Sequence, residues 1–169
     1  AAQVSWPNDP ETVRRAIAVI EATAVSSLAE LDRLQPEVRP QWSVDHLRAL
    51  VSRIRAAGTA VDLTMVEEPP ADTAVVVYRV VQESLTNVVR HAPGAAVHVT
   101  IRCDAQRTVV RVVDDGPGPA GAAGPGYGLT GLAERVGFAG GTLETGSGPG
   151  GTGFRVEAIL PARVDAVTP

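Results

Sequence analysis

The chain has few aromatic residues, a single cysteine and no excess of positive charge, and each shortage excludes a class of protein. Phe, Tyr and Trp make up 4% of its 169 residues against 44% for all apolar types, so the core must be built largely from Val, Leu, Ile and Ala. Cys103 cannot form an internal disulfide, which fits a buried structural thiol in a cytoplasmic protein. A net charge of −4 leaves no basic stripe for nucleic acid. No run reaches about 18 apolar residues, so no membrane span is predicted.

Two parts follow one another along the chain. In residues 11–34 apolar residues step alternately by four and three positions, a heptad seam typical of a helix that packs lengthwise on a partner helix. We therefore predict a long helix within residues 1–35, a proline-interrupted linker over 36–43, a folded domain over 44–162 and a disordered tail over 163–169. Because the chain does not begin with Met and opens within a pattern, we expect it to be part of a longer protein.

The folded domain is predicted to mix helices with short strands. The hydrophobic pattern predicts helices over 44–57, 71–90 and 129–138, and strands over 60–67, 96–103, 108–113, 141–145 and 154–160. Adjacent strands joined by short links favour a mixed or antiparallel sheet with helices covering one face. The predicted fold class is therefore α+β, a two-layer sandwich, and not a doubly wound parallel sheet.

The helix predicted over 71–90 carries a polar stripe on an otherwise apolar segment. Glu83, Asn87 and Arg90 follow one another at steps of four and three, so they lie on consecutive turns, with His91 beside them. A carboxylate, an amide and a cation stacked in this way could cradle a metal-bound polyphosphate. On these residues alone, a solvated helix face is the simpler interpretation.

Glycine-rich motifs follow this helix. Residues 114–118, Asp-Asp-Gly-Pro-Gly, end a strand, and a carboxylate there could accept a hydrogen bond from an exocyclic amine, although Asp-Gly turns are common. Residues 124–129 precede a helix, where converging N–H groups favour an anion, although such loops are often only flexible; no Gly-Lys-Ser/Thr follows, which excludes a P-loop. Residues 151–154, Gly-Thr-Gly-Phe, place a small hydroxyl at the start of the last strand, or form a plain glycine bend.

In their order and spacing these motifs resemble those of one superfamily. It is the nucleotide-binding domain shared by histidine kinases, gyrase, the ninety-kilodalton heat-shock chaperone and the mismatch-repair ATPases, known as the GHKL superfamily. Residues 82–92, Gln-Glu-Ser-Leu-Thr-Asn-Val-Val-Arg-His-Ala, look like the asparagine box of nitrate-sensor-like sensor kinases. Residues 114–118 and 126–136 look like the two glycine boxes, and 141–144 and 151–154 complete the set. The resemblance covers residues 41–161 and implies the Bergerat fold and the ATP-binding catalytic domain of a two-component sensor histidine kinase.

The resemblance also implies a role for individual residues. Asn87 would hold a Mg²⁺ ion that bridges the phosphates, and Glu83, one turn earlier, stands where gyrase-like ATPases keep a water-activating carboxylate. Asp114 would accept the adenine amine, supported by Thr152 through a water molecule. Gly126 and Gly128 would belong to the lid over the phosphates. The complete set of implied ATP-binding residues is Asn87, Arg90, His91, Asp114, Gly116, Gly118, Gly126, Tyr127, Gly128, Leu129 and Thr152.

The chain departs from the family pattern in its histidines. His46, His91 and His98 are its three histidines, and none lies in a His-Asp or His-Glu box before the seam helix. The seam helix would then be the second helix of a dimerisation hairpin whose first helix carries the phosphorylated histidine. The implied partners are that hairpin domain and a response regulator, and the full-length protein would be a homodimer.

Three other functions stay open at this point. One is an ATP-hydrolysing clamp with Glu83 as general base. Another is an anti-sigma-factor kinase that acts on serine. The last is a degenerate domain that binds protein partners without nucleotide.

Overall fold

The computed structural model describes residues 43–118 and 127–162, with Tyr127 described for its backbone only. All of these residues lie in the second of two compact units, Pro40–Pro169. The predicted seam helix, most of the linker, the loop 119–126 and the predicted tail lie outside the described residues.

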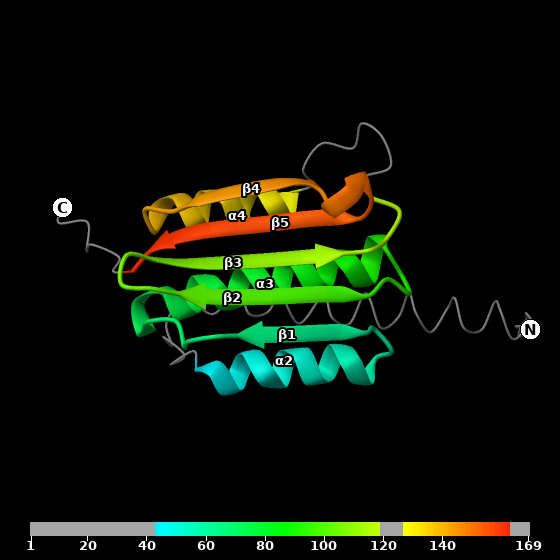
Figure 1. The fold of residues 1–169 in the computed structure, drawn as a ribbon, viewed down its shortest axis with the longest axis horizontal. Helices are drawn as coiled ribbons and strands as arrows, with labels where there is room; N and C mark the ends of the chain where they lie inside the picture. Colours follow the sequence, from blue (N-terminus) through cyan, green and yellow to red (C-terminus); the bar gives the residue numbers. More distant parts are fainter. Residues whose placement is uncertain (1–42, 119–126, 163–169) are drawn as a thin grey trace, which may run out of the picture. The chain divides into compact units, whose positions relative to one another are not determined.

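The helices and strands follow one another along the chain in the order that the hydrophobic pattern predicts (Figure 1). The observed bounds of the predicted elements differ from the predicted ones by at most two residues at either end. The largest differences are that β1 ends two residues earlier, that α4 begins two residues earlier, at Tyr127, and that β4 ends two residues later. A short 3-10 helix, η1, lies within the predicted link between the last two strands. In chain order the elements are α2 Val44–Ala56, β1 Val61–Met65, α3 Ala71–His91, β2 Val97–Cys103, β3 Arg107–Asp114, α4 Tyr127–Phe138, β4 Thr142–Ser147, η1 Pro149–Gly151 and β5 Phe154–Pro161.

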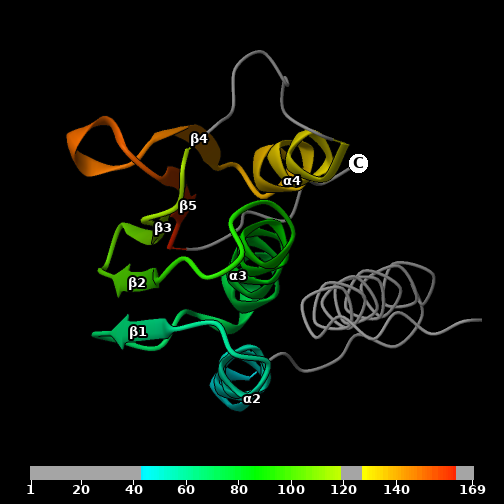
Figure 2. The same ribbon diagram turned by 90° about the vertical axis from the view of Figure 1, so that its right-hand side faces the viewer.

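The five described strands form one mixed sheet in the order β1-β2-β3-β5-β4. β1 and β2 are parallel, because the chain between them returns through α3 to the end where β1 began; the other neighbours are antiparallel. The helices α2, α3 and α4 all lie on one face of this sheet (Figure 2). The predicted α+β two-layer fold is therefore confirmed.

The core lies between α3 and the covered face of the sheet. α3 buries Val77, Val81 and Leu85 at helical spacing, and β3 buries every second residue, including Val110 and Val112. The buried hydrophobic residues are aliphatic except for Tyr78, as the shortage of aromatic residues predicts. Each fully buried Val or Leu contributes about 1.5–3 kcal/mol relative to an exposed one. The core thus fixes the position of α3, which carries the predicted asparagine box.

Ser84 provides a first prediction, about stability. Its side chain is 2% exposed on α3, and its hydroxyl has no hydrogen-bond partner among the described residues. Since an unsatisfied buried hydroxyl costs about 1–3 kcal/mol, Ser84→Ala is expected to raise the free energy of unfolding by about 1 kcal/mol in urea titrations. The matched control is Thr86→Val, because the Thr86 hydroxyl donates to the Gln82 carbonyl at 2.8 Å. That variant should lose stability, and an equal loss in Ser84→Ala would contradict this account.

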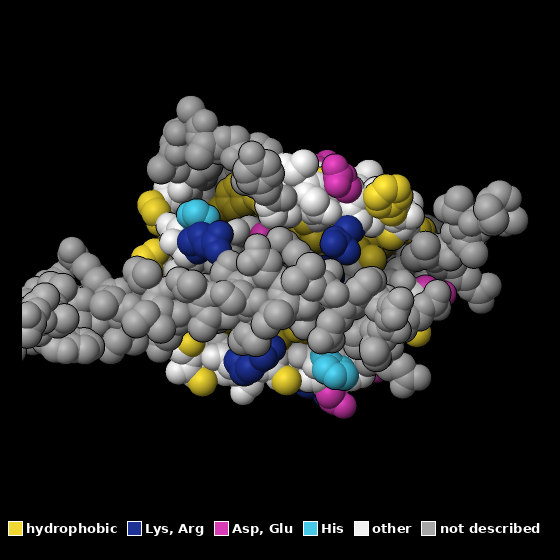
Figure 3. All heavy atoms as spheres, turned by 180° about the vertical axis from the view of Figure 1, so that it is seen from behind, with side chains coloured by type: hydrophobic (Ala, Val, Ile, Leu, Met, Phe, Trp, Pro, Cys, Tyr) yellow, Lys and Arg dark blue, Asp and Glu magenta, His cyan; other side chains and the backbone are white. Residues whose placement is uncertain are grey.

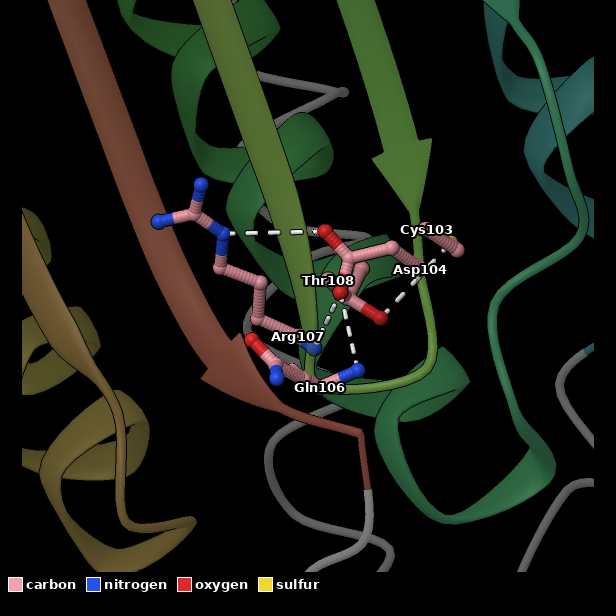
Figure 4. A network of polar contacts seen from close by, with 5 residues as sticks. All are labelled: Cys103, Asp104, Gln106, Arg107 and Thr108. Atoms are coloured by element: carbon pink, nitrogen blue, oxygen red, sulfur yellow. Dashed lines mark hydrogen bonds and ion pairs between the residues drawn. The ribbon is translucent and has the colours of Figure 1, made fainter.

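The turn between β2 and β3 is organised by one carboxylate (Figure 4). Asp104 Oδ1 accepts hydrogen bonds from the backbone N–H groups of Gln106 at 2.8 Å and Arg107 at 2.9 Å. These two bonds, with the nearby Arg107 guanidinium, hold the pKa of Asp104 below its ordinary value. The turn sets the register of β3, which ends at Asp114.

A pH dependence follows from this turn. Because the pKa of Asp104 is lower in the folded state than in the unfolded chain, its stabilising effect is complete above about pH 4 and is lost as the pH falls through the folded pKa. We expect the stability difference between the wild type and Asp104→Ala, measured by urea unfolding, to shrink between about pH 7 and about pH 2. A difference that stays constant over this range would contradict the assignment.

Cys103 is half-buried at the end of β2. The Thr108 hydroxyl donates to its Sγ at 3.6 Å, and burial raises the pKa of the thiol. The thiol therefore stays protonated at neutral pH, which suits the structural role predicted for it.

Candidate functional site

Several segments that are distant in sequence meet at one end of the domain. This end, on the right in Figure 1, holds the last turn of α3, the end of β3 and the start of β5. Asp114, the last residue of β3, pairs with Val97 at the start of β2. The fold therefore brings the end of the predicted asparagine box, the first glycine motif and the motif at residues 151–154 to the same end of the sheet.

Asp114 is held by backbone groups from two different motifs. Its side chain is buried, with the residue 7% exposed, and it is the only buried carboxylate among the described residues. Oδ1 accepts a hydrogen bond from the N–H of Gly116 at 3.0 Å and another from the N–H of Phe154 at 3.3 Å. No described residue bonds to Oδ2, which can therefore accept a hydrogen bond from a ligand.

Glycines around Asp114 permit close backbone packing. Gly153 has φ +68°, and a Cβ there would lie 1.8 Å from the Asp114 carbonyl oxygen. Its N–H donates to the Gly116 carbonyl at 3.0 Å. Gly118 has φ +75°, and a Cβ there would lie 3.1 Å from the Gly153 carbonyl oxygen. The backbone of residues 114–118 therefore packs directly against the backbone of Gly153, with no side chain between them. We call these two backbone segments the Asp114 layer.

The same layer contacts the end of α3. A Cβ on Gly116 would lie 2.6 Å from the Cβ of Ala92 and 2.9 Å from Asp114 Oδ1. Ala92 follows directly after α3, and its N–H donates to the Val88 carbonyl at 2.8 Å. The predicted asparagine-box helix and the first glycine box are therefore in direct contact.

Asp115 has a role that the sequence analysis missed. Its Oδ1 accepts the N–H of Ala96 at 2.7 Å, and its own N–H donates to the Ala96 carbonyl at 3.1 Å. This pair of bonds attaches the segment after β3 to the residue before β2. The adjacent second carboxylate in the Asp-Asp sequence was the available signal, but its partner lies 19 residues away in the chain.

The polar stripe of α3 runs toward this end of the domain. Glu83 and Asn87 are half-buried, while Arg90 and His91, both in the last turn of α3, are exposed. On the helical face shown in Figure 3, a histidine lies directly beside a Lys or Arg side chain. Along the stripe, the acidic and amide side chains are thus partly covered, and the basic side chains are at the surface.

The second glycine box is described from Tyr127 onward. Gly126 lies outside the described residues, and only the backbone of Tyr127 is described. Gly128 and Leu129 are half-buried in the first turn of α4, and a Cβ on Gly128 would lie 1.8 Å from Glu83 Oε1. The start of α4 therefore touches the helix that carries the asparagine box.

Thr152 is exposed next to Gly153. No hydrogen bond of its hydroxyl to Asp114 is present, so its predicted support for the adenine site depends on a bridging water. The described residues include no group of three or more His, Cys, Asp and Glu side chains that could hold a metal ion.

A separate hollow of about 470 Å³ lies between the end of α2 and the starts of β1 and β2. Its polar lining includes Arg55, Asp62 and His98, and the rest of its lining is Gly58, Thr59, Ala60, Val61, Ala96 and Val97. None of the predicted site residues lines it. It adjoins the candidate site through Ala96, which bonds to Asp115, and through Val97, which pairs with Asp114.

Comparison with known proteins agrees with this geometry. The family described as histidine kinase-, DNA gyrase B-, and HSP90-like ATPase matches residues 72–164. The chain is 38% identical over 95 residues to the sensor histidine kinase YxjM of Bacillus subtilis, covering 56% of this chain and 23% of that protein. It is 44% identical over 90 residues to the signal transduction histidine-protein kinase/phosphatase UhpB of Salmonella typhimurium, covering 53% of this chain and 17% of that protein.

A solved structure has the same fold. The histidine kinase domain of the Erythrobacter litoralis EL346 blue-light activated histidine kinase superposes with a TM-score of 0.55 at 24% identity, covering 69% of this chain and 57% of that chain. Within residues 43–118 and 127–162, no helix is both long enough and apolar enough to cross a membrane. The matched family covers more than half of the chain, which therefore belongs to the histidine kinase-, DNA gyrase B-, and HSP90-like ATPase family, as an ATP-binding domain of the sensor histidine kinase type.

Proposed function

We propose that this domain binds ATP with Mg²⁺ and transfers the γ-phosphoryl group to a histidine on a hairpin domain of the same kinase. The observation that carries the proposal is the position of Asp114, buried and fixed by two backbone N–H groups at the point where α3, β3 and β5 meet. The chain spans less than a quarter of the curated relatives YxjM and UhpB, so the activity of the whole protein is part of the proposal.

The adenine end of the site fits the residues present. Because Oδ1 of Asp114 is taken by Gly116 and Phe154, its Oδ2 is the atom that would accept the adenine amine. Gly116 and Gly118 present backbone without side chains, so a flat base could lie against them. A carboxylate fixed in this way favours a base with an exocyclic amine over one with a carbonyl at the same place.

The phosphate end would lie along α3. Arg90 and His91 are exposed in its last turn, and Arg is suited to bidentate contact with phosphate. Asn87 supplies an amide oxygen, the type of ligand that a hard cation takes, and Mg²⁺ commonly completes its shell with water and substrate phosphates. When bound, Mg²⁺ would neutralise charge on the β- and γ-phosphates. The chain's own part is to place the phosphates, which is most of what phosphoryl transfer requires.

The histidines within the described residues favour a phosphoacceptor elsewhere. His46 lies in the first turn of α2, where its Nδ1 is 3.0 Å from the Ser43 hydroxyl and takes part in the capping of the helix. His98 lies on β2, with Nδ1 3.7 Å from Asp62 Oδ2. We therefore propose a hairpin domain as the phosphoryl acceptor, a response regulator as its downstream partner, and a homodimer that acts in the cytoplasm.

The test begins with nucleotide titration of the chain by calorimetry, with and without Mg²⁺. We expect Mg²⁺ to strengthen the binding of a non-hydrolysable ATP analogue, and Asn87→Ala to remove this effect while metal-free binding persists. Absence of analogue binding to the wild type would refute the proposal.

A second experiment separates a kinase from its alternatives. The chain is mixed with labelled ATP and a separately produced hairpin domain of the same kinase, and we expect an acid-labile label on the hairpin histidine. Release of free phosphate without labelling would instead favour the ATP-hydrolysing clamp, and an acid-stable label on serine would favour a serine kinase.

A further inference from the structure

We infer that Glu83 is a positioning residue that holds the first turn of α4 against α3, and that Gly128 is the residue that makes room for it. The inference deepens the proposed function and rests on it, because the start of α4 belongs to the second glycine box. It assigns Glu83 a role different from the water-activating base of the hydrolysing relatives.

The geometry is a close approach of two helices at one point. A Cβ on Gly128 would lie 1.8 Å from Glu83 Oε1 and 2.8 Å from Glu83 Cδ. The carboxylate of Glu83 therefore occupies the space where a side chain at position 128 would stand. Glu83 is half-buried and Gly128 is the second residue of α4, so the contact is sheltered and lies in the first helical turn.

The charges at this point support the contact. The first turn of a helix has N–H groups without partners inside the helix and carries a partial positive charge, which a nearby carboxylate stabilises. The first turn of α4 contains no acidic residue of its own. Glu83, from the neighbouring helix, supplies the negative charge that this turn lacks.

The contact joins two parts of the proposed nucleotide site. Glu83 lies one helical turn before Asn87 on α3, and Gly128 precedes Leu129 in the second glycine box. A movement of α4 relative to α3 would therefore change the distance between the metal-binding amide and the start of α4. Holding the two helices together sets that distance before the nucleotide arrives, which lowers the cost of ordering the site on binding.

The first test is a double-mutant cycle on stability, measured by urea unfolding of the 169-residue chain without nucleotide. Gly128→Ala displaces the carboxylate, since the clashing atom is the flexible end of a side chain, and Glu83→Ala removes it. We expect each single variant to lower the urea midpoint. The midpoint of the double variant should be no lower than that of the less stable single variant, because both substitutions remove the same contact. The matched control is Gly131→Ala, on the same helix with no atom within 4 Å of its Cβ, which should be neutral or stabilising.

The second test is binding of a non-hydrolysable ATP analogue with Mg²⁺ by the same variants. We expect Glu83→Ala and Gly128→Ala each to weaken binding roughly fivefold and the double variant to show a similar loss. Glu83→Gln keeps the shape of the side chain but not its charge, so its affinity should lie between that of Glu83→Ala and that of the wild type. Additive losses in the cycle, a Gly128→Ala variant as harmless as Gly131→Ala, or equal binding by all variants would each overturn the inference. Failure of the wild type to bind the analogue would refute the proposed function, whereas the stability cycle would still decide the role of the Glu83–Gly128 contact.

Discussion

Asp114→Asn is expected to reduce ATP affinity by at least about a hundredfold while the domain stays folded. The amide oxygen of Asn can still accept the N–H groups of Gly116 and Phe154, which are the bonds that Oδ1 accepts in the wild type. The amide NH₂ then takes the place of Oδ2 and presents a donor to the donor group of adenine. The Asn NH₂ group and the adenine amine are both donors, so no hydrogen bond forms between them and both are left unpaired in a buried place. This is therefore the largest predicted effect on binding.

The measurement is calorimetric titration with ATP and Mg²⁺, together with circular dichroism to confirm that the fold is retained. Asp115→Asn is the matched control, because its amide oxygen can still accept the N–H of Ala96 and its side chain has no proposed contact with the base. The control should bind nearly as well as the wild type. Unchanged affinity in Asp114→Asn would place the adenine elsewhere.

Gly153→Ala is expected to have the largest effect on stability. Its Cβ would lie 1.8 Å from the Asp114 carbonyl oxygen and 2.9 Å from the Asp114 carbonyl carbon, which are backbone atoms and cannot rotate away. Its φ of +68° adds strain of about 1–2 kcal/mol for a residue with a side chain. The start of β5 would have to move away from β3, so we expect a loss of at least about 3 kcal/mol in the free energy of unfolding, together with loss of nucleotide binding.

Gly150→Ala separates the strain from the clash. Gly150 has φ +76°, close to that of Gly153, but no atom lies within 4 Å of its Cβ. This variant should lose only about 1 kcal/mol in urea unfolding and keep its nucleotide affinity. Similar losses in the two variants would show that backbone strain, and not contact with Asp114, makes Gly153 necessary.

Periodicity alone predicted most of the described elements. The helical spacing of Val77, Val81 and Leu85 and the alternation in β3 are local signals that depend on neighbouring residues, so they can be read without the fold. The start of α4 was placed two residues late, because its glycines and the polar Thr130 hide the apolar pattern there. The strand order, with β5 beside β3, has no local signal at all.

Periodicity predicted less of the candidate site than of the fold. The spacing of Glu83, Asn87 and Arg90 indicated a stripe, but only the family resemblance connected it with Asp114. The bond from Phe154 to Asp114 spans 40 positions, and the contact between Gly128 and Glu83 joins two helices; neither leaves a pattern along the sequence. Such contacts are set by the tertiary fold, and so the individual roles of Asp115, Gly153 and Gly128 emerged only from the geometry.

The position of β5 has a consequence for the order of synthesis. β5 is the last of the described strands in chain order, yet it is inserted between β3 and β4 in the interior of the sheet. A nascent chain that still lacks β5 therefore leaves a gap beside β3 and cannot supply the Phe154 N–H group to Asp114. During translation, the hydrogen bonds that fix Asp114, which we propose as the adenine acceptor, become complete only after the start of β5 has been synthesised.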